Sequence, residues 1–352
     1  MCRIVSRVLF DMSFQLSRFK VFSMYDRPAE RDSRYIDRPN FKAFTGHRTQ
    51  FIISAAVTGI RSDVVILSHI NLLLVAAIIK FFSPQTRIII YAHGTELWRS
   101  IRKWKSTFLK KNCEIWAVSS YTAQKLQDLY QVDSRQITIL PNCLNPYLEI
   151  PKSFIKPANL LYRYHLHASQ PVIFTLARLS SHDLYKGYDL VIECLPELIK
   201  SFPSIHYLLA GKADEKEKDR LQALIRKLGL ETHITLTGFL PEEEISKHFL
   251  LADVFIMPSR KEGFGIVFIE AAACGCKVIG GNQDGSVQAL LDGKLGTLVH
   301  PEEKQSIIKA IRKNLNHPRT ETEAQAIQKL CIEHFNYQAY FQKIQKLLVP
   351  QE

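Results

Sequence analysis

Cysteine is scarce in this 352-residue sequence, and its seven copies are odd in number and scattered. Most of them stand inside apolar runs, which indicates reduced, buried thiols and argues against a disulfide framework. Cys274-Gly275-Cys276 has no His or second Cys pair close to it, so a helix-to-strand turn explains it better than a metal site. We expect no metal site in this protein.

Long apolar runs are also missing. The first residues, Met1-Cys2-Arg3, lead into a mixed helical pattern and not into the apolar core of a signal peptide. The most apolar segment, 64–82, contains Ser68, His69 and Asn71, and it divides into a strand and a helix. We therefore expect a cytoplasmic protein without a membrane span.

Acidic residues are few in the first half of the chain. Residues 1–150 contain 21 Lys/Arg against 11 Asp/Glu, a net +10, whereas residues 151–352 contain 25 against 23, a net +2. A basic half indicates an anionic partner, such as a phospholipid surface, a lipid-linked pyrophosphate or nucleic acid. Zinc, aromatic-platform and recognition-helix signatures are absent, so we expect no nucleic-acid partner.

What the sequence does contain is an alternation of short β-rich runs and helical patterns. This alternation is typical of α/β proteins, in which helices cover both faces of a parallel sheet. In the first half, strands are predicted over 19–24, 64–68, 87–92, 113–118 and 136–140, and helices over 46–60, 71–83, 97–111 and 120–131. Segment 26–45, rich in Asp, Arg and Pro, is predicted to be an exposed loop.

The most informative stretch is a strand–glycine loop–helix–strand unit over 254–280. Its glycines let backbone amides approach a ligand, and the helix start near Gly265 offers N–H groups and a positive dipole end to a phosphate. Glu262 and Glu270 stand eight positions apart, and Glu270 would be costly to bury without a polar partner. A carboxylate is the usual acceptor for two ribose hydroxyls, although a purely structural turn is the alternative explanation.

This stretch resembles the Glu-x7-Glu region of glycosyltransferase family 4, whose members are retaining nucleotide-sugar transferases of the GT-B fold. The segment after it, 280–299, is similar to that family too. The resemblance implies two Rossmann-like domains whose parallel sheets face a central cleft. The implied divisions are an acceptor-side domain over 1–146, a linker over 147–169, a donor-binding domain over 170–335 and a C-terminal helix over 336–352 that returns to the first domain.

The resemblance also implies roles for individual residues. His93 and Glu262 would be catalytic, with the His93 imidazole beside the transferred sugar. Arg178 and Lys186 would clamp the donor pyrophosphate, where cations stabilise the developing charge of the leaving group. Taken singly, either residue could instead be an ordinary surface cation. The remaining implied ligands are Gly265 and Ile266 for the donor phosphates, Glu270 for the ribose and Leu240 for the nucleotide base.

The opening of the chain departs from the family. Family 4 enzymes begin with a strand and a Gly-Gly loop that faces the donor phosphates and the acceptor, whereas this sequence begins with a helical pattern over 2–14. A truncated chain, a misassigned start codon and loss of this element are the explanations left open.

The expected activity is retaining hexosyl transfer from a UDP- or GDP-sugar to a glycan or lipid-linked acceptor, in cell-surface polysaccharide or glycolipid synthesis. No Asp-x-Asp motif stands at the strand ends, and Arg178 with Lys186 can neutralise charge, so no cofactor is expected beyond the nucleotide-sugar substrate. The alternatives are a nucleotide-sugar binder without turnover and a GT-B epimerase or phosphorylase. We find no pyridoxal phosphate or free phosphate site for a phosphorylase.

A basic segment, 98–111, carries Trp98 and Trp104 among its cations. A cationic helix with aromatic residues can lie on anionic lipid, so this segment predicts peripheral docking on the cytoplasmic membrane face. The alternative is a solvated helix whose apolar side packs on the sheet.

Overall fold

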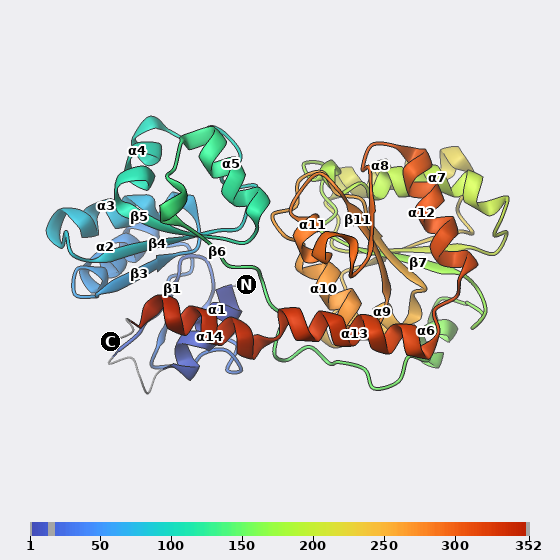
Figure 1. Ribbon diagram of the computed structural model, residues 1–352, viewed down its shortest axis with the longest axis horizontal. Helices are drawn as coiled ribbons and strands as arrows, with labels where there is room; N and C mark the ends of the chain where they lie inside the picture. The colour runs from blue at the N-terminus through green and yellow to red at the C-terminus, as the bar shows by residue number, and fades with distance from the viewer. Residues whose placement is uncertain (1, 13–17, 350–352) are drawn as a thin grey trace. The chain divides into compact units, whose positions relative to one another are not determined.

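The computed structural model describes residues 2–12 and 18–349, which form two compact α/β units (Figure 1). One unit comprises Met1–Pro146 and Tyr337–Glu352, and the other comprises Tyr147–Asn336. Each is built on parallel strands with helices between them, as the alternating sequence pattern predicts. The end of the first predicted helix, residues 13 and 14, lies outside the described residues.

The first unit contains a four-stranded sheet in the order β3-β4-β5-β6 and a separate parallel pair, β1-β2. Its strands are β1 (Val21–Ser23), β2 (Phe41–Ala43), β3 (Val64–Leu67), β4 (Arg87–Ala92), β5 (Cys113–Ala117) and β6 (Ile137–Ile139). Its helices are α1 (Cys2–Asp11), α2 (Arg48–Gly59), α3 (Leu73–Phe82), α4 (Lys103–Asn112), α5 (Ser120–Tyr130) and α14 (Tyr337–Leu348). Short 3-10 turns are η1 (Pro28–Glu30), η2 (Ile70–Leu72) and η3 (Ser134–Gln136).

Strand β4 lies inside the four-stranded sheet, which explains its uninterrupted apolar sequence. Ile88, Ile89 and Ile90 are all buried, because helices cover both faces of a parallel sheet. The last helix, α14, belongs to the same core: the Tyr340 and Tyr91 hydroxyls form a hydrogen bond of 2.8 Å. Residues from opposite ends of the chain therefore build the first unit together.

The prediction of a loop over 26–45 was wrong in part. Strand β2 lies within this segment and pairs with β1 through the register Val21↔Phe41 to Ser23↔Ala43. It is only three residues long and none of them is fully buried, so the sequence shows no apolar periodicity there.

The helix predicted over 97–111 begins at Lys103 instead. Two side chains hold the preceding residues in turns. The Glu96 carboxylate accepts hydrogen bonds from the backbone N–H groups of His93 (2.7 Å) and Gly94 (3.2 Å). The Tyr130 hydroxyl donates to the Leu97 carbonyl at 2.8 Å.

The second unit is a six-stranded parallel sheet in the order β12-β11-β10-β7-β8-β9. Its strands are β7 (Val172–Leu176), β8 (His206–Ala210), β9 (Ile234–Gly238), β10 (Val254–Met257), β11 (Lys277–Gly281) and β12 (Thr297–Val299). Its helices are α6 (Ala158–Arg163), α7 (Tyr188–Ile199), α8 (Glu215–Leu228), α9 (Glu242–Leu251), α10 (Ile266–Ala273), α11 (Ser286–Ala289), α12 (Lys304–Asn316) and α13 (Glu321–Phe335), with the turns η4 (Leu184–Lys186) and η5 (Leu291–Gly293). Helix α6 lies within the segment predicted to be a linker.

The strand order of the second unit reverses between β7 and β10. From β7 the chain proceeds outward through β8 to β9, then returns to the other side of β7 and proceeds outward through β11 to β12. Open parallel sheets bind ligands at such a reversal, beyond the carboxyl ends of the strands. We therefore expect a ligand site at the loops after β7 and β10.

The cysteines are all unpaired, and six of the seven are buried. Burial raises the pKa of Cys113, Cys143, Cys194 and Cys274 to about 12. Only Cys2 is exposed. Among the helices of the described residues, none has the length and apolar character needed to cross a lipid bilayer.

Candidate functional site

Two cations predicted to bind phosphate follow strand β7. Arg178 lies two residues beyond the strand and donates from Nε to Asp183, whose side chain is buried. Lys186 ends the 3-10 turn η4 and forms an ion pair with the Glu262 carboxylate in the loop after β10. The Arg178 side chain is 72% exposed, whereas that of Lys186 is 16% exposed. The structure therefore places one cation in solvent and the other in a carboxylate-lined recess.

Burial lowers the pKa of Lys186 to about 8, and the charges of Asp183 and Asp284 oppose this shift. The ammonium group remains predominantly charged at neutral pH. Because Lys186 is already desolvated, its ammonium group loses little further hydration when an anion reaches it, and the attraction is stronger than in bulk water.

Glycine at three positions lets the surrounding loops touch. Gly187 has a φ of +76°, and a Cβ atom there would overlap with Pro258 beside β10. Added Cβ atoms at Gly281 and Gly285 would overlap with the backbone carbonyls of Ser259 and Gly263. The loops after β10 and β11 are thus in backbone contact, which the 2.8 Å hydrogen bond from Gly285 N–H to the Glu262 carbonyl fixes.

Asp284 organises these loops, and our sequence analysis did not identify it as a site residue. Its side chain is 2% exposed, and it accepts hydrogen bonds from the backbone N–H groups of Glu262 (2.7 Å) and Ser286 (2.9 Å). Burial raises its pKa to about 6. The signal available in the sequence was an acidic residue between glycines directly after a buried strand.

The amino end of α10 points into the same region. The helix begins at Ile266 after Gly265, whose φ is +84°. The Phe268 N–H donates to the Gly265 carbonyl at 3.1 Å, so Ile266 and Val267 are the first-turn residues whose N–H groups lack an acceptor within the helix. Unpaired N–H groups and the helix dipole favour an anion at this end. Gly265 and Ile266, the two residues predicted to bind phosphate, occupy this helix start.

Glu270 lies one turn into α10 and has no hydrogen-bond partner for its carboxylate among the described residues. The side chain is partly accessible, yet protein atoms enclose it, and this burial raises its pKa to about 7. A carboxyl group in such a recess would gain from hydroxyl donors that an incoming ligand supplies.

Leu240 follows β9 at the carboxyl edge of the same sheet, and its side chain is buried. The predicted contact of Leu240 with a nucleotide base is made by its backbone. In the sheet order, β9 is the second strand from β7, with β8 between them. The neighbouring Phe239 is 73% exposed, so an apolar ring lies open to solvent beside the predicted base site.

His93 belongs to the first unit, where it directly follows β4. Its ring lies 4.7 Å from the Tyr91 ring, centroid to centroid, and the Glu96 carboxylate fixes its backbone N–H. Burial lowers the pKa of His93 to about 4, so the imidazole is neutral at physiological pH. It can therefore donate or accept a hydrogen bond without carrying charge.

The structure thus brings Arg178, Lys186, Glu262, Gly265 and Ile266 to the strand-order reversal of the second unit, with Glu270 on the helix that begins there. No group of three or more His, Cys, Asp or Glu side chains suited to a metal ion occurs within residues 2–12 and 18–349.

Two family models match the chain. The model of Glycosyltransferase Family 4 matches residues 19–147, and the model of Glycosyl transferases group 1 matches residues 163–348. The first match begins after α1 and ends at the boundary between the units, and the second covers most of the second unit together with α14.

Curated proteins with similar sequences include two mycobacterial enzymes described as GDP-mannose-dependent alpha-(1-6)-phosphatidylinositol monomannoside mannosyltransferase. The protein of Mycolicibacterium smegmatis is 32% identical over 244 residues, which are 66% of this chain and 62% of that protein. The protein of Mycobacterium tuberculosis is 29% identical over 225 residues, 61% of this chain and 56% of that protein. The chain therefore spans less than two thirds of these relatives.

Solved structures support the fold over almost the whole chain. Anabaena Alr3699/HepE, in complex with UDP-glucose, superposes with a TM-score of 0.81 at 19% identity and covers 98% of this chain and 95% of its own. WaaG, a glycosyltransferase involved in lipopolysaccharide biosynthesis, gives 0.66 at 14% identity, covering 99% and 96%. The predicted GT-B fold, with two α/β units on parallel sheets, is confirmed.

Glu270 makes the folding stability of the chain pH-dependent. Its pKa is raised from an ordinary value of 4.5 to about 7 in the fold, so the folded state holds a proton that the unfolded state releases between these values. The stabilisation of the fold by the protonated carboxyl group is fully present below pH 4.5 and is lost as the pH rises through about 7.

We therefore expect the stability of wild type relative to Glu270→Gln to fall between pH 4.5 and 7. Thermal or urea unfolding at half-unit pH steps measures this difference. Glu243→Gln, at an exposed position of α9, is the matched control and should show no such slope. A flat difference for Glu270→Gln would contradict the raised pKa.

Proposed function

Because the chain belongs to the families Glycosyl transferases group 1 and Glycosyltransferase Family 4, we propose that it transfers a hexosyl group from a UDP- or GDP-sugar, with retention of configuration, to a glycan or lipid-linked acceptor. The observation that carries the donor assignment is the gathering of Arg178, Lys186 and the amino end of α10 at the strand-order reversal. Two cations and a helix dipole at one place suit a pyrophosphate.

In this proposal the leaving group is the nucleoside diphosphate. Negative charge develops on its oxygens as the glycosidic bond breaks, and Arg178 and Lys186 stabilise that charge. The same residues make a metal ion unnecessary. Glu270 accepts the ribose hydroxyls, and the backbone near Leu240 contacts the base.

Two further residues are proposed to act at the transferred sugar. The neutral His93 hydrogen-bonds a sugar hydroxyl, since burial keeps its ring uncharged. Glu262 forms an ion pair with Lys186, so it accepts from another hydroxyl once an arriving phosphate draws Lys186 away from it. The acceptor class is suggested by relatives that act on a phosphatidylinositol mannoside and by WaaG, involved in lipopolysaccharide biosynthesis.

A nucleotide-sugar binder without turnover is the second candidate. The observation that favours it is that Arg178, Lys186 and Glu270, the residues proposed to hold the donor, all belong to the second unit, so donor binding alone does not require His93. A binding screen of UDP-, GDP- and ADP-sugars identifies the donor, and a single-turnover assay of donor hydrolysis then separates an enzyme from a binder.

The donor clamp gives one prediction. Arg178→Ala and Lys186→Ala should each slow donor turnover by the equivalent of about 2–4 kcal/mol, because each removes a charged contact to the leaving group. Rates are measured in EDTA with the donor found by the screen, and circular dichroism checks the fold. Lys216→Ala, an exposed cation of α8, is the control. Unchanged turnover in both clamp variants would refute the assigned roles.

Glu270 gives a second prediction. Glu270→Gln should weaken UDP or GDP binding by about 1.5–3 kcal/mol, the range for hydrogen bonds to a charged group. Wild-type affinity should also rise relative to the variant as pH passes about 7, because only the carboxylate accepts both hydroxyls. Calorimetry at pH 6 and pH 8 measures both effects. Equal binding by the two proteins would make Glu270 a structural residue.

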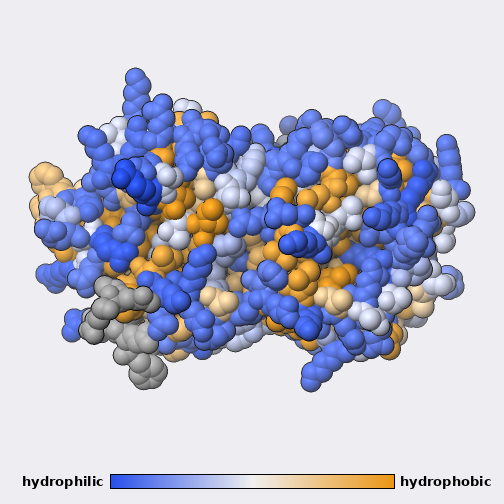
Figure 2. Space-filling model, viewed as in Figure 1, coloured by the Kyte–Doolittle hydropathy of each residue, from blue (hydrophilic) through white to orange (hydrophobic). Residues whose placement is uncertain are grey.

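A membrane-facing surface is the third element of the proposal. The exposed apolar residues Leu74 (48%), Phe81 (79%) and Phe82 (65%) lie on α3, and Trp104 (41%) lies on α4. Lys105 of α4 donates a hydrogen bond of 2.8 Å to Asn71 in the turn η2, which directly precedes α3. Figure 2 shows apolar surface at the outer edge of the first unit, where Figure 1 places α3.

Cations accompany these apolar side chains, with Arg102 and Lys103 exposed at the start of α4. Apolar side chains beside cations are the combination that binds anionic interfaces. Trp98 was predicted to belong to the lipid-binding segment together with Trp104. Its ring instead packs edge-on against Tyr121, with ring centroids 5.3 Å apart, and its Nε1 is buried. We propose that α3 and α4 dock on anionic lipid beside a lipid-linked acceptor.

Vesicle sedimentation tests this surface. Binding should require anionic lipid, weaken as salt rises, and fall when Arg102, Lys103 and Lys105 are changed to Glu or when Phe81 and Phe82 are changed to Ser. Lys216→Glu with Lys218→Glu, on α8 of the second unit, matches the loss of charge and should leave binding nearly unchanged. Equal sedimentation with neutral and anionic vesicles, or none with either, would favour a soluble acceptor.

A further inference from the structure

Three cations of the first unit lie close together without an acidic partner. Arg99 lies in the loop after β4, Arg102 directly precedes α4, and Lys105 lies in the first turn of that helix. Burial lowers the pKa of Lys105, and the positive charges of Arg102 and Arg99 lower it further. None of the three side chains forms an ion pair with a residue that the structure describes. Because unpaired cations repel one another, this arrangement indicates a place for an anion.

The turn that follows the neighbouring strand β3 contributes two further polar side chains. The Lys105 ammonium group donates to Asn71 Oδ1 at 2.8 Å, which joins α4 to the turn η2. The backbone N–H of Asn71 donates to Nδ1 of His69 at 3.0 Å. A neutral His69 ring therefore carries its proton on Nε2 and presents a hydrogen-bond donor.

The charge around His69 is positive on balance. Burial lowers the pKa of this ring, the Glu96 carboxylate opposes the shift, and the cations Lys105 and Arg99 reinforce it. The Glu96 carboxylate is already bound to backbone N–H groups of its own loop. Arg99, Arg102, Lys105 and His69, which we name the basic cluster, thus offer donors and no acceptor.

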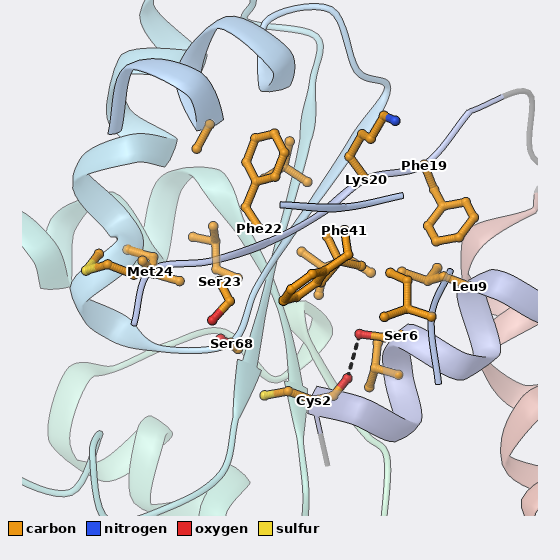
Figure 3. A pocket seen from close by; sticks show the side chains of 18 of the residues that line it. Cys2, Ser6, Leu9, Phe19, Lys20, Phe22, Ser23, Met24, Phe41 and Ser68 are labelled. Carbon is orange, nitrogen blue, oxygen red and sulfur yellow. Dashed lines mark hydrogen bonds between the residues drawn. The ribbon is translucent and has the colours of Figure 1, made fainter. Parts of the chain in front are cut away.

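The basic cluster lies beside the residue proposed to bond the transferred sugar. A cavity of about 1000 Å³ lies beside β1 and β3, which belong to the two sheets of the first unit, and Figure 3 shows Ser68 at its edge. His69 and Asn71, which follow Ser68 in the chain, line this cavity together with His93. Strands β3 and β4 are parallel neighbours, so both histidines stand at the carboxyl edge of one sheet.

We propose that the basic cluster binds a phosphate group of the acceptor and so brings the attacking hydroxyl toward His93. A phosphate ester carries up to about two negative charges and several acceptor oxygens, which match three cations and an N–H donor. Guanidinium groups suit it in particular, because they bind phosphate through two parallel hydrogen bonds. Calling the ligand an acceptor rests on the proposed function, whereas the phosphate site itself rests on the first unit alone.

A diffuse basic surface is the alternative explanation, since Arg102 and Lys105 also belong to the surface proposed to dock on anionic lipid. A diffuse surface attracts anions through its net charge, so each cation of α4 would contribute to a similar degree. A built site depends on position instead. Lys105, bonded to Asn71, and Lys111, exposed at the other end of α4, therefore separate the two explanations.

The test follows the His69 ring by NMR in the full chain, with isotope-labelled histidine and with His69→Gln to identify the signal. Glycerol 1-phosphate should shift this signal in a saturable manner, whereas glycerol, or sodium chloride at equal ionic strength, should not. Lys105→Gln and Arg99→Gln should each weaken this binding about tenfold or more, because each removes a charged contact. Lys111→Gln should weaken it by less than about twofold.

Phosphate also suits the donor site, so the titration is repeated with Arg178→Ala combined with Lys186→Ala. The His69 response should be unchanged in that variant, because the mutated residues belong to the second unit. Circular dichroism checks the fold of every variant, and Arg99 is exposed, so its replacement leaves the packing intact.

Short-chain phosphatidylglycerol, used below its micelle concentration, is the second probe. Tighter binding of this lipid assigns a lipid phosphodiester as the ligand, and tighter binding of glycerol 1-phosphate assigns a phosphomonoester. No shift of His69 with either probe, or equal weakening by Lys105→Gln and Lys111→Gln, would overturn the proposal. An intact His69 response in a protein without donor turnover would refute the proposed function and not the phosphate site.

Discussion

The architecture of the second unit depends on backbone-to-backbone contact between the loops that follow β10 and β11. Gly281 and Gly285 permit this contact, since a side chain at either position would overlap with a carbonyl of the opposing loop. Asp284 then bonds the Glu262 N–H across the junction. Without this contact, Glu262 could not be held opposite Lys186, and the start of α10 would lose its support.

Charge in the candidate site is balanced internally before any ligand arrives. Arg178 pairs with Asp183 and Lys186 pairs with Glu262, and both acids come from the loops that carry the site. Partial neutralisation lets two cations and two acids remain in a small volume without mutual repulsion. Glu270 has no such partner, and its carboxyl group is instead protonated more readily than usual.

The structure could be predicted from the sequence where a local pattern, such as a buried apolar run, determines it. Short, mostly apolar runs such as 87–92 and 254–257 are buried strands because helices cover both faces of the sheets. The Glu262–Glu270 spacing, the helix start at Gly265 and the positions of Arg178 and Lys186 could be read from the sequence, with help from the family resemblance. Contacts between distant residues could not. The start of α4 depends on Tyr130, and strand β2 forms only because it pairs with β1. The role of Asp284 depends on a loop some twenty residues earlier, which no local pattern reveals.

The exposure of a single thiol has a practical consequence for studying the first unit. The buried thiols stay protonated in the fold and react slowly with alkylating reagents, because the thiolate is the nucleophile. Cys2 alone is exposed, and it stands on the wall of the cavity beside β1 and β3. A maleimide dye would therefore attach at one native position, without mutagenesis. Its emission would report directly on water entering or leaving the space between the two sheets.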